Sequence, residues 1–271
     1  MTTLVHLSDL HFGRDVDLAQ VRALEAGMPG WAPDAIVISG DLTQRARHGE
    51  LLCAQGFVER LRKVAPTLVI PGNHDVEWWL TPLDVAGPAV RSWKYRHYFG
   101  EDLSPGLELP GLSIASVLTS HGVTWKSLTW KFWRDTAVKG HLPLDQIRAA
   151  EAVFRRAPAG ALKVLVLHHN VLRGRLSRRM GLARWREAQR RIVASGAELV
   201  LCGHDHEEGV ALLDDKVVIA TAGTHTSRTR GGRSSAFNLI QISEREIRVE
   251  PQEWDPQAGR FLPGPAAGYP R

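Results

Sequence analysis

Five short apolar runs in this chain each end in a turn that carries aspartate, histidine or asparagine. The run Leu68–Ile70 breaks at a Pro-Gly pair and is followed at once by Asn73, His74 and Asp75. Short β-branched runs that end in turn residues are typical of buried strands. The other four runs and the polar residues after them are 4–7 before Asp9 and His11, 36–38 before Asp41, 164–167 before His168, and 199–202 before His204 and His206.

These polar residues are predicted to share one site. Imidazole and carboxylate groups are costly to bury unless they are paired or bind a metal. In open α/β sheets, ligands bind at the ends of the strands. The repeated pattern therefore predicts a metal site at one edge of a sheet.

The first 75 residues alternate between strand and helix patterns. Short apolar runs predict strands at 3–7, 34–38 and 67–70, and helices are predicted between them at 17–27 and 48–63, the latter from apolar residues at helical spacing. This order predicts a parallel sheet with crossover helices, which is the arrangement of an α/β protein.

The segment 76–140 breaks this alternation and is expected to be a cap inserted over the site. Its first 60 residues hold six of the nine tryptophans. A helix is predicted at 89–99 and a hairpin at 107–109 and 112–118, whereas 119–140 is left unassigned. The tryptophans can be core residues, or some of them can wall a pocket and stack on a base. The residues considered for stacking are Trp78, Trp79, Trp125 and Trp130.

The second half continues as one domain, expected to span 1–250. Helices are predicted at 142–156 and 182–195, and strands at 162–167 and 198–201. Short strands at 209–213, 217–220, 235–242 and 246–250 are expected to form a second, mostly antiparallel layer, with a hairpin turn at Asp214-Asp215. The Pro- and Gly-rich residues 251–271 are expected to be a surface tail.

Composition places few limits on function. The net charge is +5 and the pI about 9.5, a mild preference for anionic partners. No apolar run approaches the roughly 20 residues that a membrane helix needs. The first strand begins near Thr3, so no signal peptide is expected and the cytoplasm is the predicted compartment. Cys53 and Cys202 are expected to be reduced, packed thiols.

Eight arginines follow the His168 turn. A charge run is usually a solvated helix face, and the alternative here is a patch that gathers anionic substrate. They are Arg173, Arg175, Arg178, Arg179, Arg184, Arg186, Arg190 and Arg191.

The candidate ligands are nitrogen and oxygen donors without any thiolate. This mixture suits Mn, Fe or Zn better than Ca or a structural Zn. Seven donors are too many for one ion that must also hold substrate, but they suit two ions roughly 3.5–4 Å apart that share a carboxylate. The donors are Asp9, His11, Asp41, Asn73, His168, His204 and His206.

The motifs that carry these donors resemble those of the calcineurin-like metallophosphoesterases. The resemblance covers about residues 3–250, and the bacterial branch of the class III cyclic nucleotide phosphodiesterases is the most similar. In order, the motifs are D-x-H at 9–11, G-D-L-T at 40–43, G-N-H-D at 72–75, H-H at 168–169 and G-H-D-H at 203–206. The resemblance implies a four-layer α/β/β/α sandwich of two mixed sheets with a small inserted cap.

The resemblance also assigns roles. Asp9, His11 and His206 would bind the first metal, and Asn73, His168 and His204 the second. Asp41 would bridge both metals, and it is placed with His74 in the catalytic machinery. His74 would face the leaving-group oxygen as general acid or transition-state stabiliser. Asn170 replaces the proline that is common after the paired histidines.

Further contacts are assigned from position. The candidate substrate-binding residues are Asn73, His74, His169 and Arg228. His169 has the alternative role of packing against a neighbouring residue. Asp75 and Asp205 are expected to make supporting hydrogen bonds, since metal-bound histidines commonly donate to carboxylates. His225 is expected to be a surface or satisfied core histidine, with approach to the site as the alternative, because it follows a strand.

The function predicted from these features is hydrolysis of a small phosphate ester, a cyclic nucleotide or nucleotide-like diester, through a metal-bridging hydroxide. The alternatives are a broad-specificity phosphomonoesterase and, less favoured, a metal-dependent nuclease. The nuclease is disfavoured because relatives of that kind carry extra domains. A membrane partner is not expected, and a homodimer is left open because some relatives dimerise.

Overall fold

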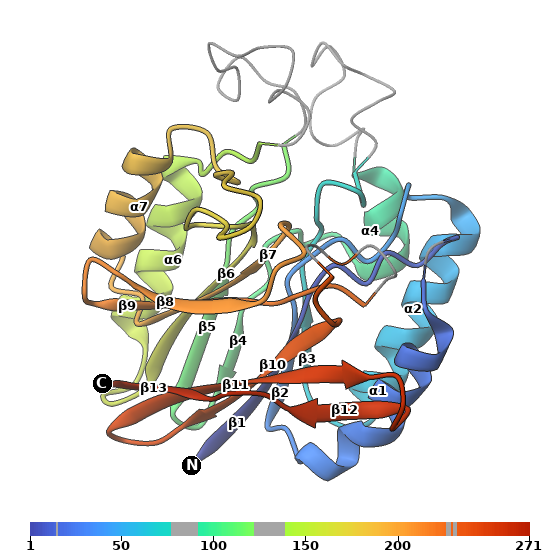
Figure 1. The fold of residues 1–271 in the computed structure, drawn as a ribbon. Helices are drawn as coiled ribbons and strands as arrows, with labels where there is room; N and C mark the ends of the chain where they lie inside the picture. Colours follow the sequence, from blue (N-terminus) through green and yellow to red (C-terminus); the bar gives the residue numbers. More distant parts are fainter. Residues whose placement is uncertain (15, 77–91, 122–138, 226–228, 230–231) are drawn as a thin grey trace.

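Two β-sheets lie face to face, and helices cover the outer face of each one (Figure 1). The computed structural model describes residues 1–14, 16–76, 92–121, 139–225, 229 and 232–271. The helices α1 (Leu18–Trp31), α2 (His48–Arg62) and α4 (Trp93–Phe99) cover one sheet, and α6 (Leu144–Arg156) and α7 (Trp185–Ala194) cover the other. This is the predicted α/β/β/α sandwich of two mixed sheets.

The first sheet has seven strands in the order β12-β11-β10-β1-β2-β3, with β13 also paired to β11. Its neighbours β1–β2 and β2–β3 pair in parallel, as the alternation of strands and helices predicts, and the other described pairs are antiparallel. Its strands are β1 (Thr2–Leu7), β2 (Ala35–Ile38), β3 (Thr67–Val69), β10 (Ala236–Ile242), β11 (Glu246–Asp255), β12 (Arg260–Pro263) and β13 (Ala267–Pro270).

The second sheet has six strands in the order β4-β5-β6-β7-β9-β8. Its four central strands are parallel, and the two edge strands are antiparallel to their neighbours. Its strands are β4 (Leu107–Leu109), β5 (Leu112–Ser116), β6 (Leu162–His169), β7 (Leu199–Gly203), β8 (Gly209–Leu213) and β9 (Val217–Thr221).

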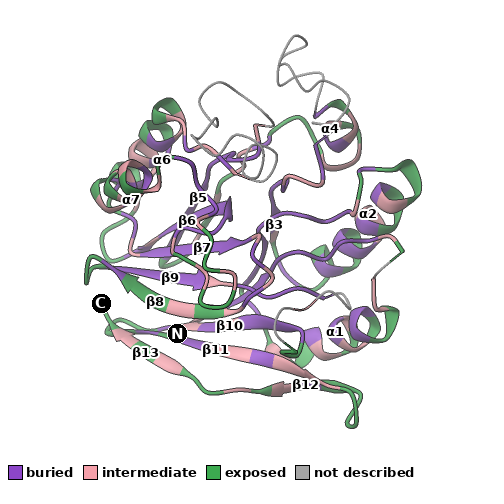
Figure 2. Ribbon diagram, turned by 45° about the horizontal axis from the view of Figure 1, so that its top comes forward, coloured by how far each residue is buried: buried purple, intermediate pink, exposed green. Residues whose placement is uncertain are grey.

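The strands are apolar on both faces because both faces are covered. In β1, Val5 and Leu7 pack under α1 and α2, whereas Leu4 packs against the second sheet. In β6, Val164 faces the first sheet and Leu165 faces the helices α6 and α7. Figure 2 shows the central strands buried and exposed residues gathered on the edge strands and outer helices.

Two expectations about the late strands were wrong. The strands after residue 209 do not form one antiparallel layer, because β8 and β9 join the second sheet while β10 and β11 join the first. Residues 251–271 are not a surface tail, since β12 and β13 pair with β11 and Phe261 is buried against Phe237. Strand pairing gives this segment a place in the sheet that its Pro- and Gly-rich composition did not indicate.

Part of the segment 76–140 that was expected to be a cap is not one. Residues 92–121 belong to the main body: α4 packs on α2 with Tyr95 buried, and the β4–β5 hairpin extends the second sheet. The stretches 77–91 and 122–138, with the four tryptophans considered for stacking, lie outside the described residues.

Two other expectations concern membranes and thiols. No helix in the described ranges is both long and apolar enough to cross a bilayer. Cys202 is buried as expected, but Cys53 lies exposed on α2.

A buried polar network joins the two sheets behind the site. His6 Nε2 lies 2.9 Å from Ser39 Oγ, and His6 Nδ1 lies 3.3 Å from Asn238 Nδ2. Asn238 Nδ2 also donates to the carbonyl of Thr221 in the second sheet, at 3.1 Å. These contacts satisfy a histidine that faces the inter-sheet core, and burial lowers the pKa of His6 to about 3 despite the nearby Asp9 carboxylate.

Stability should therefore fall as the pH is lowered through this range. The folded pKa lies below the unfolded value of 6.5, so the unfolded chain takes up a proton first. The contribution is fully present above pH 6.5 and is lost as the pH falls toward 3, by up to about 1.4 kcal/mol per pH unit. The free energy of unfolding, measured with urea between about pH 6 and pH 4, should change less with pH for His6→Gln than for the wild type. An equal pH dependence in the two proteins would mean that His6 has the same pKa in the folded and unfolded states.

Candidate metal centre

The end of β6 and the turns after β1, β2, β3 and β7 bring all seven predicted donors together. One group is Asp9, His11 and His206, and a second is Asp41, His168 and His204. In the first group, the Nε2 atoms of His11 and His206 are 2.8 Å apart, and His206 Nε2 is 3.3 Å from Asp9 Oδ1. Ligands that lie about 2.1 Å from one ion are at most about 4.2 Å apart, so these distances fit one ion.

Asn73 completes the second group. Its Oδ1 lies 3.1 Å from His168 Nε2 and 2.9 Å from His204 Nδ1. The two histidine nitrogens are 3.3 Å apart. One ion can therefore contact two imidazoles, the amide oxygen and a carboxylate.

Asp41 lies between the two groups. Its Oδ2 atom is 3.3 Å from His168 Nε2 and 3.8 Å from His11 Nε2. Because the same carboxylate faces donors from both groups, the arrangement fits two ions with Asp41 shared.

The backbone around the donors is unusual. Asp9, His11, Asp41, His204 and His206 all have positive φ, between 45° and 74°. Residues other than glycine pay about 1–3 kcal/mol for such a conformation, and they keep it where the surroundings enforce it. The turns that carry these five residues are therefore strained, and the strain directs the side chains into the site.

Hydrogen bonds from other strand ends hold these turns. The Asp9 carbonyl accepts from Thr224 Oγ1 at 2.7 Å and from the backbone of His225 at 3.3 Å, and Asp9 Oδ2 accepts from the His204 backbone at 2.9 Å. Thr224 follows β9 and was missed by the sequence reasoning, although its position after a strand was the available signal. The His225 ring itself packs against Phe237 and Phe261 behind the site.

Asp75 supports the site through hydrogen bonds from backbone amides and one hydroxyl. Its carboxylate accepts from the amides of Gly72, Leu42 and Thr43 at 2.8–3.0 Å and from the Thr43 hydroxyl at 2.8 Å. Burial and the nearby Asp41 raise its pKa. This carboxylate fastens the Asp41 turn to the turn that carries Asn73.

Asp205 accepts from the hydroxyl of Ser177. It therefore connects the turn of His204 and His206 to the arginine-rich loop. This is also a supporting contact, made to the protein scaffold.

Two glycines allow the turns to approach one another. A Cβ at Gly72 would overlap the Asp41 backbone and carboxylate, and one at Gly203 would overlap Ser8 and the Asp9 carboxylate. These contacts explain the glycines that begin the G-N-H-D and G-H-D-H motifs.

Gly203→Ala should displace Asp9 and lower metal content together with activity. Gly209→Ala is the matched control, because a Cβ there meets no atom within 4 Å. Elemental analysis of both variants checks this, and an unchanged metal content in Gly203→Ala would contradict it.

The histidines are oriented by backbone carbonyls. His168 Nδ1 lies 2.9 Å from the Ser39 carbonyl, which leaves Nε2 to face the site. His74 Nδ1 lies 2.8 Å from the Gln44 carbonyl, and its ring lies edge-on to His11 with centroids 4.8 Å apart. Metal-binding histidines commonly have such a partner on the second nitrogen.

The electrostatics favour bound cations. Burial alone would lower the pKa of His168, yet the Asp41 carboxylate raises it to about 9. Burial would raise the pKa of Asp41, but His168, His74 and His11 outweigh burial and hold it below its usual range. Among the residues that the structure describes, buried Asp9 Oδ1 has no hydrogen-bond partner, a position that a metal ion would satisfy. Metal binding would displace the proton from His168.

One predicted substrate contact, His169, is packed among neighbouring side chains. His169 is buried, its Nδ1 is 2.8 Å from Thr119 Oγ1, and its ring lies 4.4 Å from that of the predicted ligand His204. Arg228 lies outside the described residues. The roles of the donors, of His74 and of these two residues stay predictions.

Comparisons with known proteins agree with this geometry. The model of the calcineurin-like phosphoesterase family matches residues 2–208, whereas a search of curated proteins found no match. A purple acid phosphatase from yellow lupin (Lupinus luteus) seeds is similar, with a TM-score of 0.65 and 10% identity over 100% of this chain and 54% of that chain.

Two further structures are similar over nearly the whole of both chains. A dimetal phosphatase from Danio rerio has a TM-score of 0.63 and 14% identity, covering 97% of this chain and 98% of its own. Vps29 from Cryptosporidium parvum has a TM-score of 0.51 and 10% identity, with 100% and 98% covered. At these identities the likeness shows the fold alone. With the family model matching most of its length, this chain belongs to the calcineurin-like phosphoesterase family.

Proposed function

We propose that this phosphoesterase is a phosphodiesterase that uses two divalent or trivalent ions, Mn, Fe or Zn, to hydrolyse a small nucleotide-like diester. The observation that supports this most directly is that Asp41 faces donors of both groups. Two bound cations would supply activation of water and neutralisation of phosphoryl charge. Asp9, His11 and His206 would hold one ion, and Asn73, His168 and His204 the other.

The position of His74 supports a diester whose leaving group needs a proton. Nδ1–H of His74 donates to the Gln44 carbonyl, so the protonated ring would give its Nε2 proton to the leaving oxygen. Asn73 Oδ1 faces the donors, which leaves its Nδ2 to contact a phosphoryl oxygen. The motif resemblance to class III cyclic nucleotide phosphodiesterases supports a diester as the substrate.

Turnover of bis-p-nitrophenyl phosphate tests the proposal. The protein would be loaded in turn with Mn, Fe or Zn, and its metal content measured before the assay. Hydrolysis that rises with occupancy up to two ions supports the proposal. No turnover in protein shown to carry two ions would overturn it.

A phosphomonoesterase is the second candidate, because the fold and donor set serve monoesters equally well. The ratio of kcat/KM for bis-p-nitrophenyl phosphate to that for p-nitrophenyl phosphate distinguishes them. A ratio well below one would favour the monoesterase.

A further inference from the structure

His169 lies beside the second donor group and contacts one of its members. It stands at the end of β6 opposite Gly203 of β7, so its ring comes next to that of His204, which follows Gly203. The two ring centroids are 4.4 Å apart, and the ring planes are inclined by 43°. Because His169 is buried, its ring can act on the site only through the residues that it contacts.

In the part of the chain that the structure describes, no hydrogen bond holds the second ring nitrogen of His204. The first, Nδ1, faces Asn73 Oδ1 at 2.9 Å and His168 Nε2 at 3.3 Å, which is the side on which an ion would bind. His168 differs, since the Ser39 carbonyl holds its nitrogen that faces away from the site. Metal-binding histidines commonly have such a partner. Another contact therefore has to fix the orientation of the His204 ring.

The ring of His169 is itself fixed on two sides. Its Nδ1 lies 2.8 Å from Thr119 Oγ1. On another side the ring packs on Gly140, where a Cβ would lie only 2.3 Å from Nδ1. Gly140 is held in place, because its amide donates to the Gly181 carbonyl at 2.8 Å and its carbonyl accepts from the Ala183 amide at 2.9 Å. The ring therefore forms a rigid wall beside the second donor group.

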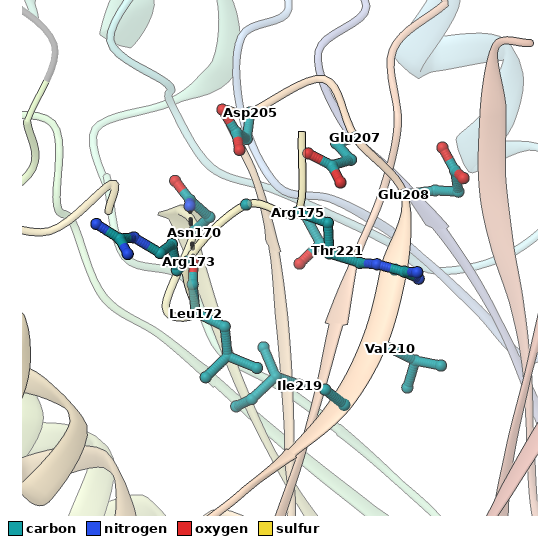
Figure 3. Close-up of a pocket in the computed structure, with 13 residues that line it drawn as sticks. Asn170, Leu172, Arg173, Arg175, Asp205, Glu207, Glu208, Val210, Ile219 and Thr221 are labelled. Carbon is teal, nitrogen blue, oxygen red and sulfur yellow. Dashed lines mark hydrogen bonds between the residues drawn. The ribbon is translucent and has the colours of Figure 1, made fainter. Parts of the chain in front are cut away.

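The backbone that carries the two rings is anchored to the neighbouring loop. Asn170 and Asp205, which follow the two histidines directly, both line the pocket drawn in Figure 3. Asn170 Nδ2 donates to the Leu172 carbonyl at 2.8 Å, and Asp205 accepts from the Ser177 hydroxyl. With both chain positions held, side-chain rotation of the donor histidine is the freedom that remains, and the neighbouring ring limits it.

We infer that His169 is a positioning residue for the second donor group: its ring holds the His204 ring in the orientation that directs Nδ1 toward the second ion. The inference rests on the proposed two-ion function and gives a part in it to a residue that is not one of the seven donors. Thr119 and Gly140 act through His169, because they fix its ring. Moving this ring should weaken binding of the second ion and leave the first ion unaffected.

Calorimetric titration of the metal-free protein with Mn²⁺ tests the inference. The wild type should show two binding steps, and His204→Ala, which removes a donor, identifies the step that belongs to the second ion. Gly140→Ala displaces the His169 ring without changing any donor. It should weaken the second-ion step by about tenfold or more, the usual effect of altering a residue that supports a metal ligand. The other step should be unchanged.

Matched variants separate positioning from a general loss of structure. Gly209→Ala adds the same methyl group where no atom lies within 4 Å, so it should leave both steps unchanged. Thr119→Val removes the hydroxyl that faces His169 and should weaken the second-ion step, whereas Thr119→Ser keeps the hydroxyl and should bind like the wild type. Equal weakening of both steps in Gly140→Ala, or no change in either step, would overturn the positioning role.

The proposed function is judged separately. Two bound ions without hydrolysis of bis-p-nitrophenyl phosphate would overturn the proposed function, and the calorimetry would still decide the positioning role. If the wild type binds fewer than two ions, NMR of the metal-free protein decides it. A nuclear Overhauser effect between the rings of His169 and His204 that is lost in Gly140→Ala upholds the role. An effect that Gly140→Ala retains, or that the wild type lacks, overturns it.

Discussion

Asp41→Asn is expected to remove bound metal from both positions and to lower kcat/KM by more than about 100-fold. Loss of a residue that only supports a metal ligand costs about 10–100-fold, and Asp41 faces both donor groups directly. The substitution keeps the size of the side chain and an oxygen that can accept from the His74 backbone, as Asp41 Oδ1 does at 2.8 Å. What it removes is the negative charge.

The loss of charge acts on both ions at once. Asp41 is the carboxylate that raises the pKa of His168 to about 9, so the same field would stabilise a cation beside that ring. Without it, the second donor group consists of neutral donors only. Two ions a few ångströms apart would then repel each other with only Asp9 to offset their charge.

Metal content and kcat/KM should be measured on the same preparations. Asp214→Asn, an exposed position in the β8–β9 turn, is the control for loss of one carboxylate. Activity of Asp41→Asn within about tenfold of wild type, with two ions still bound, would show that Asp41 does not bridge.

The sequence predicted the central strands well because each is a short apolar run that ends in a turn. The seven donors could be named because each follows such a run, so the carboxyl ends of parallel strands had to bring them together. Periodicity could not assign β8 and β9 to one sheet and β10 to the other, since sheet membership depends on pairing between distant strands.

The supporting residues were harder to predict than the donors. Thr224 and the Ser39 and Gln44 carbonyls act through hydrogen bonds that exist only once five turns have met. The carbonyl contacts depend on backbone position and leave no mark in the sequence. The arginines after His168 were visible as a charge run, but the run alone could not show which of them line a pocket.

His74→Ala should separate metal binding from catalysis. His74 lies beside His11 and Asp41, but its Nδ1 is held by the Gln44 carbonyl and it is predicted to be no metal ligand. The alanine variant keeps the backbone amide that donates to Asp41. Both ions should therefore remain bound, while turnover falls by about 10²–10⁴, the usual worth of a general acid.

The loss of turnover in His74→Ala should depend on the leaving group of the substrate. A p-nitrophenolate needs little help from a proton donor, whereas an alkoxide needs a proton as the bond to phosphorus breaks. We therefore expect a smaller loss of kcat with bis-p-nitrophenyl phosphate than with an alkyl diester. His97→Ala, an exposed histidine on α4, serves as the control. Equal losses for both leaving groups would exclude proton donation and leave His74 as an electrostatic contact to the phosphoryl group.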